Sequence, residues 1–552
     1  MTIAARVTRN QQIGYCPHTD TSGETWQLVK RGVTTAAGSV TSLVDTGGDS
    51  GGAATYAGRY WVRMTSGDAK GRMKRIVVDD GSGTLTLENN GLPAAPGSGE
   101  SYEIWQSPDP VIVVDSSSGA TNVVDAVRNE EANDFWVGYY LCVIHGDKRG
   151  EIAPVTGYTK ATGTFTLGSG LSGALTAADV CVLRKFLEVA PNDGTTQAFF
   201  ERLTDRLTGS IGDGVLGAKS GTLSFDSHVY GSNSAAASGS EANASILSGL
   251  FQACGFAEAI GTSSTATGGT AAAPTIETGS WENHPIGSMA IVNGMPVFVT
   301  GQTDGGGSDD TLAVTPDLPV APTTEAVYAS RMYRRNVNAS DGDYGAVLFE
   351  LEVDGIRTTM TGCRGNVGFT DGEPPMLNWE FQVDHYVREI ERAPYNAGAA
   401  YTTAAPIMSH DRLVYVDETA ACIGGVAASL NNEVAPKMVQ GACGINGRAG
   451  FAHVRSNPGG SYRQILAADG ALDADAKWFA RTSNDLIIVY GSSEGNMFAI
   501  RMPAARLVED PKHADEGGMQ IAPSVIRAHD AGVVANGDSE TTKVPDFAFH
   551  IF

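Results

Sequence analysis

Residues 1–186 contain one sequence pattern twice, and this duplication limits the folds that the chain can adopt. Four blocks of the pattern match at a nearly constant offset: 41–45 with 121–125, 61–71 with 140–150, 83–87 with 163–167, and 91–92 with 170–171. Four separate matches at one offset would not be expected by chance. The segment therefore indicates a duplicated module.

Each copy of the repeat alternates apolar and polar residues with the period of a β-strand. Thr84–Leu87 reads TLTL and Thr164–Leu167 reads TFTL, so every second side chain is apolar. A Gly-Asp pair in each copy is typical of a hairpin turn. We therefore predict two small β modules, the first within residues 1–110 together with an N-terminal arm, and the second within 111–186.

A fainter third copy runs from Trp281 to Arg331, where TLAV at 311–314 precedes PDLP at 316–319. It lacks the Gly-Thr signature of the first two copies. This segment would place an inserted β module at 277–333.

Two later segments alternate apolar residues with acidic or amide residues. In Val347–Asp354 one face carries Phe349, Leu351 and Val353, and the other carries Glu350, Glu352 and Asp354. In Leu377–Asp384 the apolar residues alternate with Asn378, Glu380, Gln382 and Asp384. Each strand is expected to bury its apolar face and present a row of carboxylates on the other. The rows could equally be an ordinary solvated sheet face.

The order of elements at 355–383 recurs at 495–522, and a short helix is expected ahead of each set of strands, at 244–255 and at 470–480. We therefore expect two tandem β units, at 187–395 and 405–552. The predicted fold class is mainly β, with two β-barrel or sandwich units, each flanked by a short helix, and two small β modules ahead of them.

The stretch DGIRTTMTGCRGNVGFTDGEPPMLNWEFQV at 354–383, preceded by a strand and a short helix, resembles the major tail tube protein of long-tailed, siphovirus-type bacteriophages. The resemblance covers about 200–552. It implies a structural virion protein of the phage tail that is assembled in the host cytoplasm. Neighbouring subunits would join their strands into a barrel around a central channel, and the rings would stack into a tube.

The resemblance also implies the partners of the chain. Two units per chain would let a trimer form a pseudo-sixfold ring; a hexamer is the alternative. Other tail proteins would bind at the tube ends, and DNA would pass through without specific binding. The residues expected to line this channel are Glu350, Glu352, Asp354, Glu380 and Asp384.

The charge balance fits a conduit better than a nucleic-acid reader. The net charge is −24, which argues against binding to phosphates or to an anionic membrane. Residues 1–186 hold 16 basic and 19 acidic residues, whereas the rest of the chain holds 22 and 43. A wall lined with carboxylates would repel DNA at every step. The sequence has no long apolar run and no apolar signal core, so we expect neither a membrane span nor secretion by that route.

No motif predicts an enzyme, a cofactor site or a metal site. Residues 48–52 spell GDSGG, the motif around the nucleophile of chymotrypsin-like serine proteases. Those proteases place their catalytic His and Asp upstream of the motif, but here the upstream segment is too short to hold them and contains a single histidine, His18. Residues 168–173 match GxGxxG without a βαβ unit, and 304–310 lack the ligand spacing of a calcium loop. The ten histidines show no metal-binding spacing, and the seven scattered cysteines are expected to be reduced thiols.

A different virion component remains the alternative. The N-terminal modules would also suit a capsid decoration protein or a fibre that binds host glycans.

Overall fold

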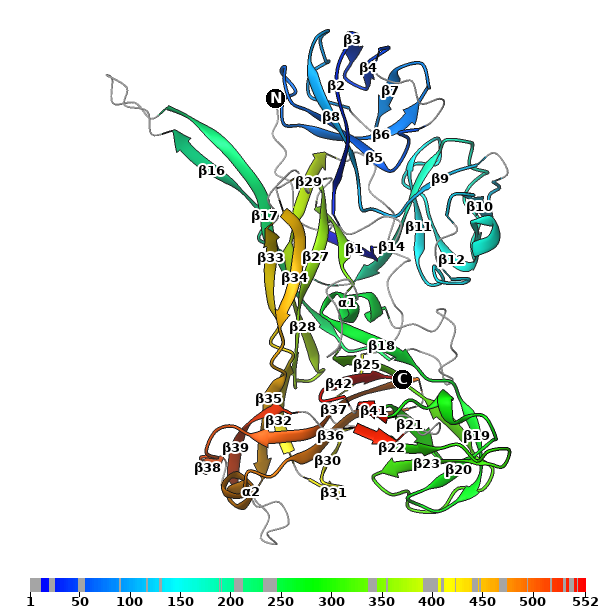
Figure 1. Ribbon diagram of the computed structural model, residues 1–552, viewed down its shortest axis with the longest axis vertical. Helices are drawn as coiled ribbons and strands as arrows, with labels where there is room; N and C mark the ends of the chain where they lie inside the picture. The colour runs from blue at the N-terminus through cyan, green and yellow to red at the C-terminus, as the bar shows by residue number, and fades with distance from the viewer. Residues whose placement is uncertain are drawn as a thin grey trace.

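Strands make up almost all of the regular structure in the computed structural model (Figure 1), which confirms the mainly β fold class. The structure describes residues 11–18, 25–47, 55–88, 91–115, 118–128, 132–187, 189, 191–202, 212–231, 246–335, 345–353, 356–390, 406–408, 412–421, 423–438, 445, 448–465, 474–493, 495–516, 519–529, 533–535, 541–543 and 545–552.

The first module is a sheet in the order β2-β8-β5-β6-β7-β4-β3. Its strands are β2 (Gln27–Val33), β3 (Ala36–Ser39), β4 (Ser42–Val44), β5 (Tyr60–Met64), β6 (Met73–Asp79), β7 (Thr84–Leu87) and β8 (Ser101–Gln106). The second module consists of β9 (Val111–Val113), β10 (Asn122–Val124), β11 (Tyr140–His145), β12 (Ile152–Thr159), the 3₁₀ turn η1 (Lys160–Thr162), β13 (Thr164–Leu167) and β14 (Val180–Leu187).

The two modules pair their strands in the same register. Leu43 lies opposite Leu85 in the first module, and Val123 lies opposite Phe165 in the second. A β-bulge interrupts the pairing of β6 with β7 between Ile76 and Val78, and the pairing of β12 with β13 is interrupted at the equivalent point. The duplication seen in the sequence is therefore a duplication of strand order, register and bulge.

A third module with this strand order is inserted in the body and closes into a barrel. Its strands β19 (Ser264–Gly269), β20 (Pro274–Ile276), β21 (Met289–Val292), β22 (Met295–Thr303), β23 (Asp310–Thr315) and β24 (Ala326–Ala329) close on themselves, and η3 (Trp281–Asn283) precedes β21. One backbone hydrogen bond recurs in all three copies: Leu92 N donates to Val40 O at 2.7 Å, Leu171 N to Ala120 O at 2.9 Å, and Leu318 N to Ala271 O at 3.0 Å. This inserted barrel spans 264–329, whereas the sequence placed its start at 277.

The remaining strands form the body. They are β1 (Gln11–Pro17), β15 (Asn192–Asp193), β16 (Thr196–Arg202), β17 (Gly212–His228), β18 (Phe256–Ile260), β25 (Arg331–Arg335), β26 (Val347–Val353), β27 (Ile356–Thr370), β28 (Met376–Val383), β29 (His385–Ile390), β30 (Arg412–Val416), β31 (Thr419–Ala420), β32 (Ile423–Ser429), β33 (Glu433–Met438), β34 (Arg448–Arg455), β35 (Gly459–Ile465), β36 (Asn484–Ser493), β37 (Asn496–Leu507), β38 (Ala514–Glu516), β39 (Met519–Ala528), β40 (Val533–Ala535), β41 (Thr541–Lys543) and β42 (Ala548–Ile551).

One hydrophobic core holds the body together, with residues from Ile13 to Ile551. The last strand, β42, pairs with β25 on one side and β37 on the other, so Phe549 lies opposite both Tyr333 and Ile500. The units expected at 187–395 and 405–552 therefore share a core instead of standing apart.

Both short helices lie near their expected positions. Helix α1 (Ser248–Ala253) buries Phe251, whose ring stacks on Tyr333 at 4.7 Å, and it is followed by Gly255 with a φ of 85°. The positive φ is easily reached only by glycine, which suits the end of a helix. Helix α2 (Ala474–Ala480) lies in the range expected for the second helix.

The molecule is elongated (Figure 1). The first two modules lie at one end, the inserted barrel lies at the other, and the body connects them. Among the residues that are described, no helix has the length and apolarity needed to cross a membrane.

Candidate functional site

Strand β28 has the two-faced character that its sequence predicts. Leu377, Trp379, Phe381 and Val383 are buried in the body core. Glu380 points to the opposite side and is exposed. Its neighbours across the sheet are Ser224 on β17 and Asn366 on β27. These three strands therefore form an open sheet face, which we call the polar face.

The polar face carries hydroxyl and amide groups with two exposed carboxylates, Asp226 and Glu380. Asn378 Nδ2 donates a hydrogen bond to Asp226 Oδ1 at 2.8 Å, and Thr370 Oγ1 donates to Asn378 Oδ1 at 2.8 Å. The one arginine in the paired segments 221–228, 364–370 and 376–383 is Arg364, and it is buried. The described part of this face is thus hydrophilic and weakly acidic.

The acidic row of β26 does not face solvent, which corrects the channel-lining role expected for it. Glu350 is 6% exposed and Glu352 is 4% exposed. Asp384, which follows β28, is 2% exposed. Asp354 lies outside the described residues. Of the five carboxylates expected to line a channel, Glu380 alone is exposed among those described.

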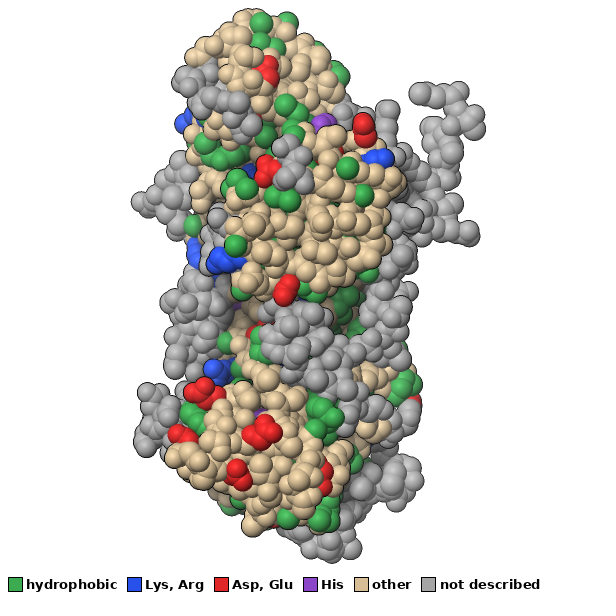
Figure 2. Space-filling view, turned by 90° about the vertical axis from the view of Figure 1, so that its right-hand side faces the viewer, with side chains coloured by type: hydrophobic (Ala, Val, Ile, Leu, Met, Phe, Trp, Pro, Cys, Tyr) green, Lys and Arg blue, Asp and Glu red, His purple; other side chains and the backbone are tan. Residues whose placement is uncertain are grey.

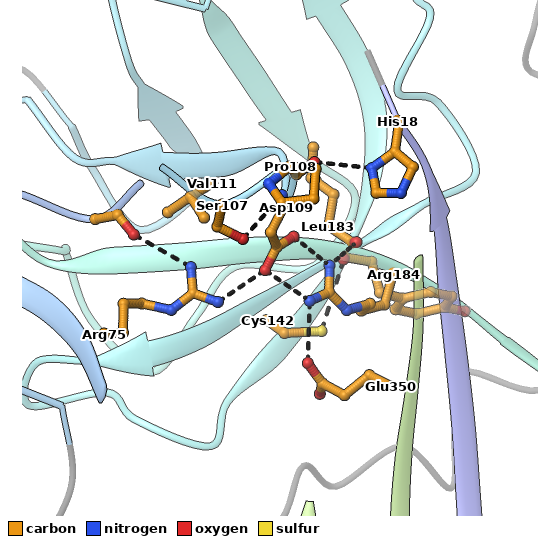
Figure 3. Close-up of polar contacts among 12 residues, drawn as sticks. His18, Arg75, Ser107, Pro108, Asp109, Val111, Cys142, Leu183, Arg184 and Glu350 are labelled. Carbon is orange, nitrogen blue, oxygen red and sulfur yellow. Dashed lines mark hydrogen bonds and ion pairs between the residues drawn. The ribbon is translucent and has the colours of Figure 1, made fainter. Parts of the chain in front are cut away.

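Two arginines neutralise the buried Glu350: Arg184, which is far away in the sequence (Figure 3), and Arg357, which lies on the neighbouring strand β27. Arg184 Nη2 lies 3.0 Å from Glu350 Oε2, and Arg357 Nε lies 3.4 Å from Glu350 Oε1. Strand β1 lies between β26 and β14, and its Gly14 permits this approach: a Cβ there would lie 3.3 Å from the Cβ of Arg184.

The contacts extend into a buried network of three arginines and three carboxylates, which we call the ionic junction. Figure 3 shows its centre, with Arg75, Arg184, Asp109 and Glu350. Asp109 accepts hydrogen bonds from Arg184 through both carboxylate oxygens at 3.1 Å, and from Arg75 Nη2 at 2.8 Å. Arg75 Nε lies 3.3 Å from Glu88 Oε2, and Arg357 Nη1 lies 4.0 Å from Glu88 Oε1.

The ionic junction connects four parts of the chain. Arg75 and Glu88 belong to the first module, Asp109 to the linker, and Arg184 to the second module; Glu350 and Arg357 belong to the body. Its formal charges cancel, which a buried ionic cluster requires. Burial by itself would raise the pKa of Asp109, but the guanidinium groups of Arg184 and Arg75 outweigh it and hold this pKa well below its usual range. The junction is a structural anchor that fixes both modules on the body.

A second feature concerns the hairpin of β16 and β17, which projects from the body (Figure 1). Thr196 lies opposite Ser220, and the pairing continues to Arg202 and Gly212. From Gly221 onward β17 pairs with β28 instead. In the described backbone, the part of the hairpin beyond Lys219 is paired only with itself, so it presents strand edges that another chain could pair with.

The motifs that the sequence analysis set aside have structural roles or lie outside the described residues. Asp310, the last residue of the glycine-rich loop, accepts hydrogen bonds from the backbone N–H groups of Ser280, Trp281 and Gly305. The GxGxxG match at 168–173 follows β13 and precedes no helix in the described chain. The whole GDSGG motif, residues 48–52, lies outside the described residues.

Metal-ligand and cysteine chemistry give no further site in this part of the chain. No group of three or more His, Cys, Asp or Glu side chains that could hold a metal ion occurs among the described residues. Five cysteines are described, and all are buried free thiols: Cys16, Cys142, Cys181, Cys254 and Cys363. Burial raises the pKa of Cys16 to about 12, so its thiol is unreactive.

The ionic junction was not predicted from the sequence, although the sequence contains one signal for it. Arg184 interrupts the apolar run VCVLRKFL of β14. An arginine inside such an apolar strand indicates a buried partner, because an unpaired buried charge is very costly.

Comparison with known proteins gives no family assignment: no family model matches the chain, and no curated protein matches its sequence significantly.

Proposed function

We propose that this chain is a structural subunit of a long-tailed phage tail, which assembles with copies of itself into the tail tube. The proposal rests on the sequence resemblance. It is supported by a mainly β body with a single core, a flanking helix α1, and a projecting β-hairpin. The observation that carries it is the hairpin of β16 and β17, whose free strand edges suit pairing between subunits.

The polar face replaces β26 as the proposed channel wall. Its exposed groups are hydroxyls, amides and the carboxylates of Asp226 and Glu380, and its one arginine is buried. Such a surface offers DNA phosphates no cation to bind, and its two carboxylates repel them. The wall would therefore act more through the lack of attraction than through a continuous acidic row.

The first experiment is negative-stain electron microscopy of the full chain as its concentration is raised. The proposal predicts hollow rings or tubes with a central hole wide enough to pass duplex DNA. Solid trimers or persistent monomers would favour a decoration or fibre protein instead.

A shortened hairpin tests the observation that carries the proposal. Residues 199–217 are replaced by Asn-Gly, which favours a tight two-residue turn and leaves the pairs Thr196 with Ser220 and Gln197 with Lys219 intact. The variant should keep the thermal unfolding midpoint of the native chain but lose tube formation. The matched control removes Ser169 from the exposed turn that follows β13 in the second module, and it should form tubes like the native chain. Tubes formed by the shortened variant as readily as by the native chain would contradict the role of the hairpin.

A further inference from the structure

The three copies of the small β module differ sharply in charge. Residues 27–106 contain eight basic and eight acidic residues, and residues 111–187 contain six and eight. Residues 264–329, the inserted barrel, contain seven acidic residues and no Lys or Arg. Because all three copies share one strand order, the fold does not require this charge.

Four of these acids gather at one end of the inserted barrel. Glu277, Glu282, Asp304 and Asp309 are all exposed. Thr278 Oγ1 donates a hydrogen bond to Ser308 O at 2.8 Å, and the N–H of Ser280 donates to Asp310 at 2.7 Å, so the two segments are held together. We call this group the acidic tip. Figure 2 shows carboxylate side chains over the lower lobe that contains it.

A basic surface lies in the opposite half of the molecule, between the first module and the root of the projecting hairpin. Lys70 and Arg72 are exposed in the turn between β5 and β6. Lys219 of β17 and Arg388 of β29 both lie 5.2 Å from the centre of the Tyr386 ring. Val387, next to Arg388, belongs to the same hydrophobic cluster as Met73, next to Arg72, so the cations of the two elements lie near one another. Burial, and then the charges of Arg63, Arg72 and Arg388, lower the pKa of Lys219 to about 8.

The carboxylates around this basic surface only partly offset it. Arg63 Nη1 lies 3.9 Å from Glu103, Arg388 Nη2 lies 2.9 Å from Asp193, and Asp68 is exposed in the same turn as Lys70. The carboxylate of Glu100 also lies against Gly67 of this turn. Five cations thus face four carboxylates, and the surplus is positive on a chain whose net charge is −24.

We propose that the acidic tip of one subunit docks on this basic surface of the next subunit, so that copies of the chain join head to tail. The inference rests on the proposed function and specifies the contact that would stack successive rings. The two surfaces lie in opposite halves of an elongated molecule, so copies aligned along its long axis bring unlike charges together (Figure 1). A head-to-tail contact between different surfaces is open and propagates into a filament. Charge complementarity of this kind fixes the partner and the register.

Two charge-reversal variants of the full chain test this contact. The tip variant carries Glu277→Lys, Glu282→Lys and Asp309→Lys. The base variant carries Lys70→Glu and Arg72→Glu. Each variant alone should raise the critical concentration for assembly at least about tenfold, because like charges then meet in every contact. A 1:1 mixture should assemble again, since the altered tip of one variant fits the altered base of the other.

Matched controls use exposed residues outside both surfaces. Asp317→Lys lies past the far end of β23 from the acidic tip, and Lys160→Glu lies in η1 of the second module. Both controls should assemble like the native chain. Raising the salt concentration should weaken native assembly, because exposed charges are screened within about 10 Å at 0.1 M salt.

Sedimentation velocity of each variant and of the mixture reports pairwise association whether or not hollow tubes form. Association restored only in the mixture supports the contact. Native-like tubes from each variant alone would overturn the docking inference and leave the proposed function standing. Native protein that associates through this contact without forming rings or tubes would support the contact and reject the tail tube. Absence of association in the native chain and in the mixture would overturn both.

Discussion

Three copies of one small β module are attached to the same body, and the two junctions that hold them differ in chemistry. The first two modules are held by the ionic junction, in which three arginines and three carboxylates are buried together. The inserted barrel is held by apolar contacts, in which Met289, Ile291 and Phe298 pack against a set of body residues: Ile487, Val489, Met497, Ala499 and Phe552.

The apolar junction contains a buried imidazole, His550, and the guanidinium of Arg501 lies 5.2 Å from the centre of the Phe298 ring. His550 Nδ1 accepts a hydrogen bond from Met289 N at 3.3 Å, and its ring lies 5.2 Å from that of Phe298. Burial, and then the charge of Arg501, lower the pKa of His550 to about 3, so the imidazole is neutral at pH 7. The two junctions should therefore fail in different ways: the ionic junction when one partner is removed, and the apolar junction when acid charges its histidine.

The largest expected effect is the loss of Asp109, which bridges Arg75 and Arg184. Asp109→Ala leaves both guanidinium groups buried with fewer partners, and breaking a buried ion pair in this way costs about 3–5 kcal/mol. Urea denaturation should show a fall of this size in the free energy of unfolding. Asp147→Ala, at an exposed position in the second module, is the control and should change it by less than about 0.5 kcal/mol. A small effect of Asp109→Ala would mean that the modules are not held by this network.

Mild acid should weaken the apolar junction first. The unfolded chain binds a proton at His550 near pH 6.5, whereas the folded protein does so only near pH 3, so protons favour unfolding between these values. The stability should begin to fall as the pH drops below 6.5, and His550 alone should account for about 2 kcal/mol by pH 5.

The carboxylates of the ionic junction respond in a lower range. The pKa values of Asp109 and Glu350 are both lowered in the folded protein, because their arginine partners outweigh the effect of burial. Their contribution is complete above about pH 4.5 and is lost as the pH falls further. The apolar junction therefore loses stability at a higher pH than the ionic junction does.

His550→Gln keeps a hydrogen-bond acceptor and removes the titration, so it should flatten the loss of stability between pH 7.5 and pH 5. The unfolding free energy at several pH values is the measurement. His513→Gln, at an exposed position, serves as the control and should keep the native slope. His284 and His453, whose pKa values burial lowers to about 4, should retain part of the slope in the variant. An unchanged slope in His550→Gln would show that this junction does not respond to acid.

The same comparison explains what could be predicted from the sequence. The register of the first two modules follows from the constant offset of the repeat, because the matched blocks are the paired strands themselves. The two faces of β28 follow from simple alternation. In both cases the local sequence pattern was sufficient to predict the structure.

The burial of Glu350 could not be read from alternation. A strand face covered by arginines has the same sequence pattern as one that faces water. The partner of Glu350 is Arg184, 166 positions away, and a contact of that range leaves no periodic trace in a single sequence. The third barrel was placed too late for a related reason: without the Gly-Thr signature, its first strands, β19 and β20, had no counterpart to match.

The smallest expected effect separates the two acidic strands. Glu380→Lys, on the exposed side of β28, should change the free energy of unfolding by less than about 0.5 kcal/mol, because its side chain lies in solvent. Glu350→Lys should cost about 3–5 kcal/mol or prevent folding, because it adds a cation beside Arg184 and Arg357 in a buried site. Urea denaturation of both variants measures the difference. Equal, small effects would mean that the modules leave β26 open in solution, and Glu350 would then be free to face a channel as the sequence alone suggested.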